Sequence, residues 1–472
     1  MPVTTLHPDY TLYSPQWKLT RDATRGDPAI KRDDSYLPAP FRTSDPERYE
    51  QYKARAYFVG VTGRTENAMI GMVFRKSPEY VLPPALEALL ENLDGAGNSA
   101  EQLAKDAMAG LLETRRHLFL SDYPSAAKGL DAETESNLGL RPVIAQYSAE
   151  ALINWRFETV AGQSKLVLAV LRERVNNSED EFGHDYDWQY RVLRLRKITE
   201  TDGVSFPRYL LAKEHYIYTQ TVYDDSGDII TPEFTPRMAG GATFDHIPLH
   251  GVRQLETPPL YDIAKVNVAH YRNIADLEDA AYVVGQPMVH VDTGETSATE
   301  WVELNPSGIE FGSRKGVVTK GGGIELVQAA ENNLIRQAKL DKENEMVMLG
   351  AQLIIRGGQA ETAEAARIRA GAEASVLDML TNDLSEDLEA AIEDMARFMG
   401  LPVDGVEYRL STDFFEAGLN PQDLSAILQA KTLGVVARYD VRQMIRSGRI
   451  GIDPERTDEV IDEEVASEVL DG

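Results

Sequence analysis

Cysteine is absent from this chain of 472 residues, which excludes disulfide bonds, thiolate metal sites and cysteine nucleophiles. The absence fits a reducing compartment. No uninterrupted apolar stretch approaches the ~20 residues that a membrane helix needs, and the first residues show no basic-then-apolar signal pattern. We therefore expect a soluble protein with no membrane partner, which stays in the compartment or particle where it is made.

Positive charge is scarce. The chain has 76 Asp and Glu against 48 Lys and Arg, for a net charge of -28 at pH 7. A basic footprint that wraps nucleic acid is therefore absent from the chain as a whole. Hydrophobic residues make up 43% of the sequence, with 20 tyrosines, so the chain can bury a core and fold into several domains.

Catalytic motifs are also missing: the sequence has no GxxxxGK[ST], GxGxxG, HExxH or GxSxG. The acidic stretch "SEDEFGHDYD", residues 178–187, offers ligands for a hard cation but lacks the spacing of a Ca²⁺ loop, and we favour an acidic β-hairpin tip. His246 and His250 are four residues apart, but Pro248 between them disfavours the helix that would align them on a metal. We expect no enzymatic activity and no metal or cofactor.

Helices dominate the expected structure of the first 120 residues. Residues 1–44, rich in Pro, Asp, Arg and Thr, favour an extended arm. Asp45 followed by Pro46 is typical of a helix start. Ser99 with Gln102 forms a capping-box pattern, which predicts a helix that ends near residue 116.

The period of the sequence changes to that of strands between residues 141 and 223. The predicted strands, rich in β-branched and aromatic residues, are 143–147, 152–157, 165–170, 190–196 and 215–223. "DDSGD", residues 224–228, predicts a hairpin turn. We assign Tyr147, Asn154, Trp155 and Arg156 to the core of this region and its hydrogen bonds. Helices followed by an antiparallel β region indicate an α+β fold.

Long helices dominate the second half of the chain. The predicted order is a helix over 257–284 opened by Thr257-Pro258-Pro259, a small β-containing insert over 288–327, a helix over 328–353, a Gly357-Gly358 break, and a helix over 360–399. The last helix would reach ~60 Å, too long to fold back inside one globule. Its first half is rich in Ala and Glu, which suits close packing of neighbours, although a solvated amphipathic helix has the same composition.

This order of elements resembles the portal proteins of tailed bacteriophages, and local sequences match one subgroup of them. The matching phrases run from about Asp34 to Gly448 and are "DDSYLPAP", "ARAYFVGVTGRTENAMIGMVFRKSP", "YSAEALINWRFE", "VNVAHYRNIADLEDAAYVVGQP", "ELNPSGIEFGSRKG", "GAQLI", "ETAEAARIRAGAEASVLDML" and "STDFFEAGL". No single phrase is as specific as a metal motif. Their order along the chain is what carries the resemblance.

The resemblance implies a portal-type α+β subunit whose parts follow one another along the chain. They are an N-terminal arm (1–44), a wing that is helical and then β-rich (45–256), a first stem helix (257–287), a clip (288–327), a second stem helix (328–353), a tunnel loop (354–360), a tunnel helix (361–400), wing and short crown helices (401–450) and an acidic tail (451–472).

The same resemblance implies a non-enzymatic ring, usually of about twelve copies, at one capsid vertex of a virion, assembled in the host cytoplasm. Such a ring conducts double-stranded DNA during packaging and ejection. It docks the terminase, later holds adaptor and tail proteins, and meets the major capsid and scaffold proteins. A net charge of -28 suits a conduit, because a strongly cationic wall would trap DNA through counterion release.

Candidate site residues follow from this scheme. Those of the tunnel loop and the start of the tunnel helix are Ile355, Arg356, Gly357, Gly358, Gln359, Glu361 and Glu364. Those for brief phosphate contact on the stem are Lys265, Arg272, Arg336, Lys339 and Lys342, for which exposed helix charges or salt bridges are the alternative. Arg314 and Lys315 are candidates for docking a partner at the clip.

Two other functions stay open on the sequence. One is a different virion structural or scaffold protein with long helices, although a scaffold needs no β insert between two of them. The other is a metal-dependent nuclease that uses the acids of 178–187.

Overall fold

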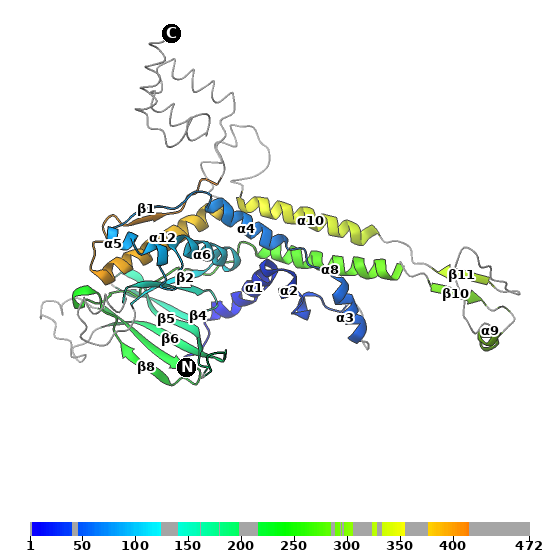
Figure 1. Ribbon diagram of the computed structural model, residues 1–472, viewed down its shortest axis with the longest axis horizontal. Helices are drawn as coiled ribbons and strands as arrows, with labels where there is room; N and C mark the ends of the chain where they lie inside the picture. Colours follow the sequence, from blue (N-terminus) through cyan, green and yellow to red (C-terminus); the bar gives the residue numbers. More distant parts are fainter. Residues whose placement is uncertain are drawn as a thin grey trace, which may run out of the picture. The chain divides into compact units, whose positions relative to one another are not determined.

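The chain mixes helices with antiparallel sheets, which confirms the expected α+β class (Figure 1). This computed structural model describes residues 2–39, 46–123, 140–160, 162–178, 180–197, 216–284, 288–292, 294, 297–304, 323–327, 333–354 and 376–414. The chain divides into two compact units, one of residues 1–70 with 78–410 and one of residues 71–77 with 411–472. In the second unit Lys76 Nζ lies 2.6 Å from Asp413 Oδ2. The elements described below belong to the first unit, apart from the end of α4.

The N-terminal segment is helical and not an extended arm, so that expectation is wrong. Its elements are α1 (Pro8–Arg25), α2 (Asp27–Ile30) and the 3₁₀ turn η1 (Asp34–Tyr36). The His7 side chain accepts a hydrogen bond from Asp9 N at 3.2 Å and caps α1, and Gly26 ends the helix at φ 83°. Trp17 is fully buried. The prediction failed because it relied on the high content of Pro and charged residues. One side of α1 carries residues that pack into the core.

The next helices follow the predicted pattern. They are α3 (Pro46–Arg55), α4 (Val61–Val73), α5 (Pro84–Glu87), the 3₁₀ turn η2 (Leu90–Asn92) and α6 (Ala100–Thr114). Ser99 caps α6 by accepting from Gln102 N at 3.2 Å, which confirms the predicted start. Arg115, at φ 61°, ends α6 in the left-handed region.

The largest sheet has five antiparallel strands in chain order: β4 (Leu152–Val160), β5 (Gln163–Asn176), β6 (Tyr186–Lys197), β7 (Tyr216–Asp224) and β8 (Ile229–Phe234). Ala169 pairs with Leu193, and Leu193 with Gln220. The predicted turn at 224–228 is confirmed, with Asp224 N bonded to Asp228 O at 2.9 Å. β8 was not predicted, because most of its side chains are exposed and its residues do not alternate between apolar and polar.

Smaller sheets complete the architecture. The order β3 (Val143–Ser148), β2 (His117–Asp122), β9 (Leu249–His250) forms one, and β1 (Glu79–Val81) with β12 (Glu407–Arg409) forms another. β2 was not predicted, because its sequence "HLFLSD" is buried almost throughout and does not alternate between apolar and polar residues. Ser121 Oγ of β2 donates to Ala391 O at 2.8 Å, which ties β2 to the helix α12 (Val376–Met399).

The main core lies between one face of the five-stranded sheet, the β2 sheet, α1 and the end of α12. Its fully or nearly fully buried side chains include Trp17, Leu118, Leu120, Leu171, Leu193, Phe244 and Phe398. Phe244 and Phe398 meet edge to face at 4.7 Å between ring centroids. Full burial of each such side chain contributes roughly 1.5–3 kcal/mol. No helix among the described residues is long and apolar enough to span a bilayer.

We predict that Trp17→Ala lowers the free energy of unfolding by about 3–5 kcal/mol, because it removes the largest buried side chain that α1 contributes to the core. Leu12→Ala on the same helix is the matched control. Leu12 is 64% exposed, so its truncation should change the free energy by less than ~0.5 kcal/mol. Urea unfolding followed by circular dichroism measures both, and equal effects would contradict the packed position of α1.

Candidate functional site

Two long helices stand on either side of a small insert in the middle of the chain. The order is α8 (Tyr261–Val284), β10 (Met288–Asp292), α9 (Ala298–Leu304), β11 (Gly323–Val327) and α10 (Asn333–Ile354). α8 and α10 lie side by side and antiparallel (Figure 1), and β10 pairs with β11 from Met288↔Val327 to Asp292↔Gly323. At 1.5 Å per residue the helices are about 36 and 33 Å long.

The start of α8 corrects the predicted boundary. Thr257, Pro258 and Pro259 precede the helix and do not form its first turn, since Tyr261 N bonds to Pro258 O at 3.0 Å and the first helical bond runs from Ala264 N to Leu260 O at 2.9 Å. The proline pair makes a turn that delivers the chain to the helix.

The part of α8 up to Ala275 is buried among the N-terminal helices. Ala264, Val268, Tyr271 and Ala275 share a core cluster with residues of α1, α2, α3 and η1. Near the centre of this buried part, Asn267 is fully buried and its side-chain hydrogen bonds leave the helix. Its Oδ1 accepts from Thr62 N at 3.2 Å and Thr62 Oγ1 at 3.0 Å, and its Nδ2 donates to Val59 O at 2.9 Å. This amide fixes α8 to the start of α4.

The next residues of α8, 276–282, are less buried and are held by α3. Tyr52 OH donates to Asp276 Oδ1 at 2.7 Å, and Arg55 pairs with Asp279 while its guanidinium lies 4.3 Å from the Tyr282 ring. Burial, followed by the hydrogen bond to Asp276, raises the pKa of Tyr52, so its phenol stays neutral. Near the end of the helix, Ala281 and Tyr282 are exposed to solvent.

α8 meets α10 through a buried histidine. The His270 ring is fully buried, and its Nε2 lies 3.2 Å from Glu343 Oε1 on α10. Lys339 Nζ lies 3.2 Å from the same oxygen. Burial lowers the pKa of His270, against the opposing pull of Glu343. The contact therefore works with a neutral imidazole that donates to a carboxylate.

The structure engages most of the predicted stem cations within the chain. Lys265 is exposed and lies 3.6 Å from Asp262, Arg272 Nε donates to Tyr36 O at 2.8 Å, and Lys339 pairs with Glu343. Arg336 is exposed, and Lys342 is half-buried near His270. The five residues do not converge on one site.

Two groups of predicted residues lie outside the described part of the chain. They are the tunnel-loop group, Ile355, Arg356, Gly357, Gly358, Gln359, Glu361 and Glu364, and the clip pair Arg314 and Lys315. Of the helix predicted over 360–399, the structure describes α12 (Val376–Met399). Most apolar residues of α12, among them Leu380, Leu384, Leu388 and Met395, are buried in the chain's own core.

α10 carries exposed apolar side chains that the sequence analysis did not single out: Leu334, Leu340, Val347 and Met348. At 3.6 residues per turn they fall within about 140° of the helix circumference. The same arc carries the exposed polar residues Asn333, Gln337, Asp341 and Asn344, so the four apolar side chains are separated by polar ones. A cluster of large exposed apolar side chains on one helix is still unusual for a surface that nothing covers.

The paired histidines of the sequence converge on a buried acid. His246 Nε2 and His250 Nε2 lie 3.1 and 2.8 Å from Asp394 Oδ2, on α12. Burial acts to lower the pKa of His246, but the hydrogen bond and charge of Asp394, then those of Asp245, outweigh it and raise the pKa above its ordinary value. The two histidines thus tie α12 to the strand region through their contacts with this one carboxylate.

The acids of 178–187 lie at the connection between β5 and β6. Their partners are local: Asn177 Nδ2 donates to Asp187 Oδ2 at 2.8 Å, and Phe182 N donates to Asp180 Oδ1 at 3.1 Å. Among the residues that the structure describes, no group of three or more His, Asp or Glu side chains is placed to hold a metal ion.

A model of one protein family, a domain of unknown function (DUF4055), matches residues 259–399 of the chain. The matched region begins two residues before α8 and ends at the last residue of α12. The match therefore covers the paired helices, the insert and α12. No curated protein matches.

Solved structures with a likeness to this chain come from gene transfer agent (GTA) particles. A chain in the neck of an empty GTA particle is 14% identical over 86% of this chain and 96% of its own length, with a TM-score of 0.38. A chain in the neck of a native particle is 13% identical over 88% and 97%, with a TM-score of 0.39. A third, from the native GTA virion, is 11% identical over 88% and 98%, also at 0.39. These scores do not establish a shared fold.

We predict that Asn267→Ala lowers the free energy of unfolding by about 2–3 kcal/mol, because it leaves the buried Thr62 N–H and hydroxyl without their acceptor. Asn273→Ala on the same helix is the control. Asn273 Nδ2 has no hydrogen-bond partner among the described residues, so its loss should cost less than about 1 kcal/mol. Urea denaturation compares them, and equal losses would remove Asn267 as the anchor of α8.

A second prediction concerns pH. A histidine whose pKa is raised on folding contributes stability that is fully present below its ordinary pKa of 6.5 and is lost as the pH rises through the folded value. His246→Gln should therefore lower the free energy of unfolding by about 1.5 kcal/mol at pH 6 and by less at pH 8. Urea titrations of both proteins at the two pH values measure this; a loss that stays constant or grows with pH would contradict the ion pair with Asp394.

Proposed function

We propose that the chain is a virion structural protein of the phage head–tail region, and specifically a portal-type subunit. In this proposal about twelve copies close into a ring at one capsid vertex. The ring conducts double-stranded DNA in packaging and ejection, and it docks the terminase and then adaptor or tail proteins. It has no catalytic site of its own.

The observation that carries the proposal is the pair α8 and α10 with a small paired-strand insert between them, followed by α12. The fully buried side chains of α8 end at Ala275, while residues 276–282 are less buried and α10 runs back beside the helix. This matches the stem, clip and stem order that the sequence resemblance implies. A scaffold built for temporary capsid contacts needs no such insert.

The exposed side of α10 supports assembly with further copies. Leu334, Leu340, Val347 and Met348 expose apolar area that would be covered if the pairs α8 and α10 of neighbouring copies stood side by side around an axis. In such a ring each copy contacts one neighbour through one surface and the other neighbour through a different surface.

The charges suit a conduit. On α12 the acids Asp383, Asp387 and Asp394 pair with Arg115, Arg253 and the two histidines. Most of the stem cations are likewise engaged within the chain, as described above. Few free cations are left among the described residues of the stem to hold DNA, which carries about one negative charge per 1.7 Å of axis.

A metal-dependent nuclease is the second candidate, and it makes a distinct prediction. Divalent-metal-dependent DNA cleavage that is lost in Asp185→Ala and Asp187→Ala would establish it and contradict a conduit. The local hydrogen bonds of the 178–187 connection favour a structural role for these acids.

We predict that the purified protein forms rings of about twelve copies with a central hole, seen by native mass spectrometry and electron microscopy. Replacing Val347 and Met348 on the exposed side of α10 with Asp should shift the protein to monomers, because two desolvated charges would oppose the contact. Glu345→Asp, at an exposed position of the same helix, is the control and should leave rings intact. A wild-type chain that stays monomeric at every concentration would exclude the portal function.

A second prediction addresses the sequence-derived tunnel loop. Deleting residues 357–359 should leave ring assembly unchanged but impair DNA packaging or retention. The reason is that the loop is proposed to contact DNA and not a neighbouring subunit. Infectivity of phage that carries the deletion is the measurement, with ring mass as the control. Normal infectivity would show that the tunnel-loop assignment is wrong.

A further inference from the structure

β5 and β6 continue as a two-stranded ribbon beyond the rest of the five-stranded sheet. Their pairing runs through Arg174↔Trp188 to Asn176↔Tyr186. On one side the β4 partner ends at Leu152↔Leu171, and on the other β7 ends at Gln189↔Asp224. Residues 174–176 and 186–188 therefore pair only with each other, and the connection between them projects past the strand ends. A projecting ribbon of this kind is not needed to close the core.

The tip of this ribbon, residues 180–185, is held in one shape by its own hydrogen bonds. Asn177 N donates to Asp185 O at 2.9 Å, Asp185 N to Ser178 Oγ at 2.6 Å, and Gly183 N to Asp180 O at 2.9 Å. A Cβ at Gly183 would lie 2.9 Å from Ser178 Cβ, so the turn has room only for glycine there. The tip is thus ordered before it meets any partner.

This ordered tip presents a phenylalanine to solvent. Phe182 is 79% exposed, the most exposed large apolar side chain among the described residues. The neighbouring Asp180 and Glu181 are exposed, as is Asp185. The tip therefore presents one exposed apolar side chain flanked by negatively charged ones. An exposed phenylalanine on a preformed turn is typical of a residue that enters a pocket on a partner.

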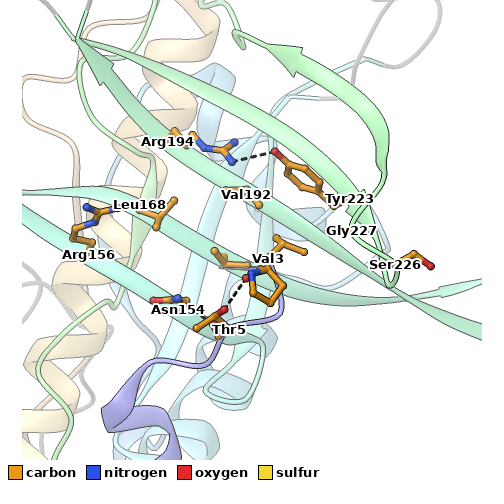
Figure 2. Close-up of a pocket in the computed structure, with 12 residues that line it drawn as sticks. Val3, Thr5, Asn154, Arg156, Leu168, Val192, Arg194, Tyr223, Ser226 and Gly227 are labelled. Atoms are coloured by element: carbon orange, nitrogen blue, oxygen red, sulfur yellow. Dashed lines mark hydrogen bonds between the residues drawn. The ribbon is translucent and has the colours of Figure 1, made fainter.

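A pocket of complementary character lies on the outer face of the same sheet (Figure 2). Its volume is about 570 Å³, and its floor includes Val3, Leu168, Val170 and Val192. The N-terminal segment forms one wall, since Asn154 Nδ2 donates to Thr5 O at 3.0 Å. A volume in this range accepts an aromatic ring with adjoining side chains.

Two arginines give the pocket positive charge. Arg156 has a side chain that is 63% exposed, with Nη1 3.5 Å from Glu158 Oε1. Arg156 was predicted from the sequence to lie in the core, and this exposure shows that the prediction is wrong. Arg194 donates to Thr221 Oγ1 at 3.0 Å and Tyr223 OH at 3.2 Å, which occupies two of its five N–H groups. Both guanidinium groups retain donors for a carboxylate, in a chain whose net charge is -28.

We propose that the tip of the β5–β6 ribbon of one copy docks into this pocket of a neighbouring copy. Phe182 enters the apolar floor, while Asp180 and Glu181 pair with Arg156 and Arg194. The contact rests on the proposed function, because it is one of the contacts that would hold the ring together. It joins two different surfaces, and repeated heterologous contacts of this kind close into rings.

The occupant is a second copy and not the chain's own tip. The ribbon continues β5 and β6 past their shared ends, whereas the pocket opens on the face of the sheet where β4, β5, β6 and β7 are paired. An antiparallel ribbon cannot fold back onto its own face without breaking those pairs. The apolar floor of the pocket matches Phe182 and its arginines match the flanking acids of another copy, whereas a phosphate group would satisfy the arginines alone.

The test measures the protein concentration at which half of the chains are assembled, by mass photometry, for matched single variants. Phe182→Ala should raise that concentration by about tenfold or more, the effect of an interface anchor worth over 1 kcal/mol. Phe157→Ala is the control, since Phe157 is an exposed phenylalanine of the same sheet that does not line this pocket, and it should leave assembly near the wild-type value.

Charge reversal tests the pairing itself. Asp180→Arg with Glu181→Arg should weaken assembly, Arg156→Glu should weaken it too, and chains that combine all three should recover most of the lost assembly. Arg156 is exposed, so its variant keeps the fold, which circular dichroism verifies. Rings that form at the wild-type concentration with Phe182→Ala, or no recovery in the combined variant, would overturn this contact while leaving the ring function intact. A wild-type chain that never assembles would overturn both.

Discussion

Burial of α8 up to Ala275 is the constraint on which the rest of the structure depends. Ala264, Val268, Tyr271 and Ala275 place this part against the N-terminal helices, and the Asn267 amide bonds to Thr62 and Val59 at and before the start of α4. A buried amide held at both its oxygen and its nitrogen resists a shift of the helix, because a shift leaves buried polar atoms unpaired. The rest of α8 and its partner α10 are therefore anchored at this buried part.

The body around this anchor uses its sheet in two ways. One face of the five-stranded sheet packs Leu171 and Leu193 into the core against Trp17 of α1, while the other carries arginine and aromatic side chains over a pocket. Alternation along the strands produces both faces at once, because successive side chains point to opposite sides. The sheet can thus serve stability and contact with a neighbouring copy without a separate element for each.

Electrostatics in this acidic chain are largely local. Arg191 illustrates it, since it joins Glu173 and Asp122 across two sheets, and the His246–His250–Asp394 group ties α12 to β9 and the segment before it. His270 stays neutral because burial lowers its pKa, so the α8–α10 contact does not depend on a charged imidazole. The exposed side of α10 is mixed, with Leu334, Leu340, Val347 and Met348 standing among exposed polar side chains.

The sequence by itself determined the α+β class, the capped start of α6, five strand positions and the long helices in the second half, because each depends on local periodicity and on capping or turn residues. The helical nature of the first 44 residues was decided only by tertiary structure, since Trp17 needs the core around it to hold α1 in place. The same holds for β2, for the meeting of His246 and His250 with Asp394, and for the pocket that Arg156 and Arg194 border. Those features join residues far apart in the chain, and spacing within a sequence carries no information about which distant side chains will meet.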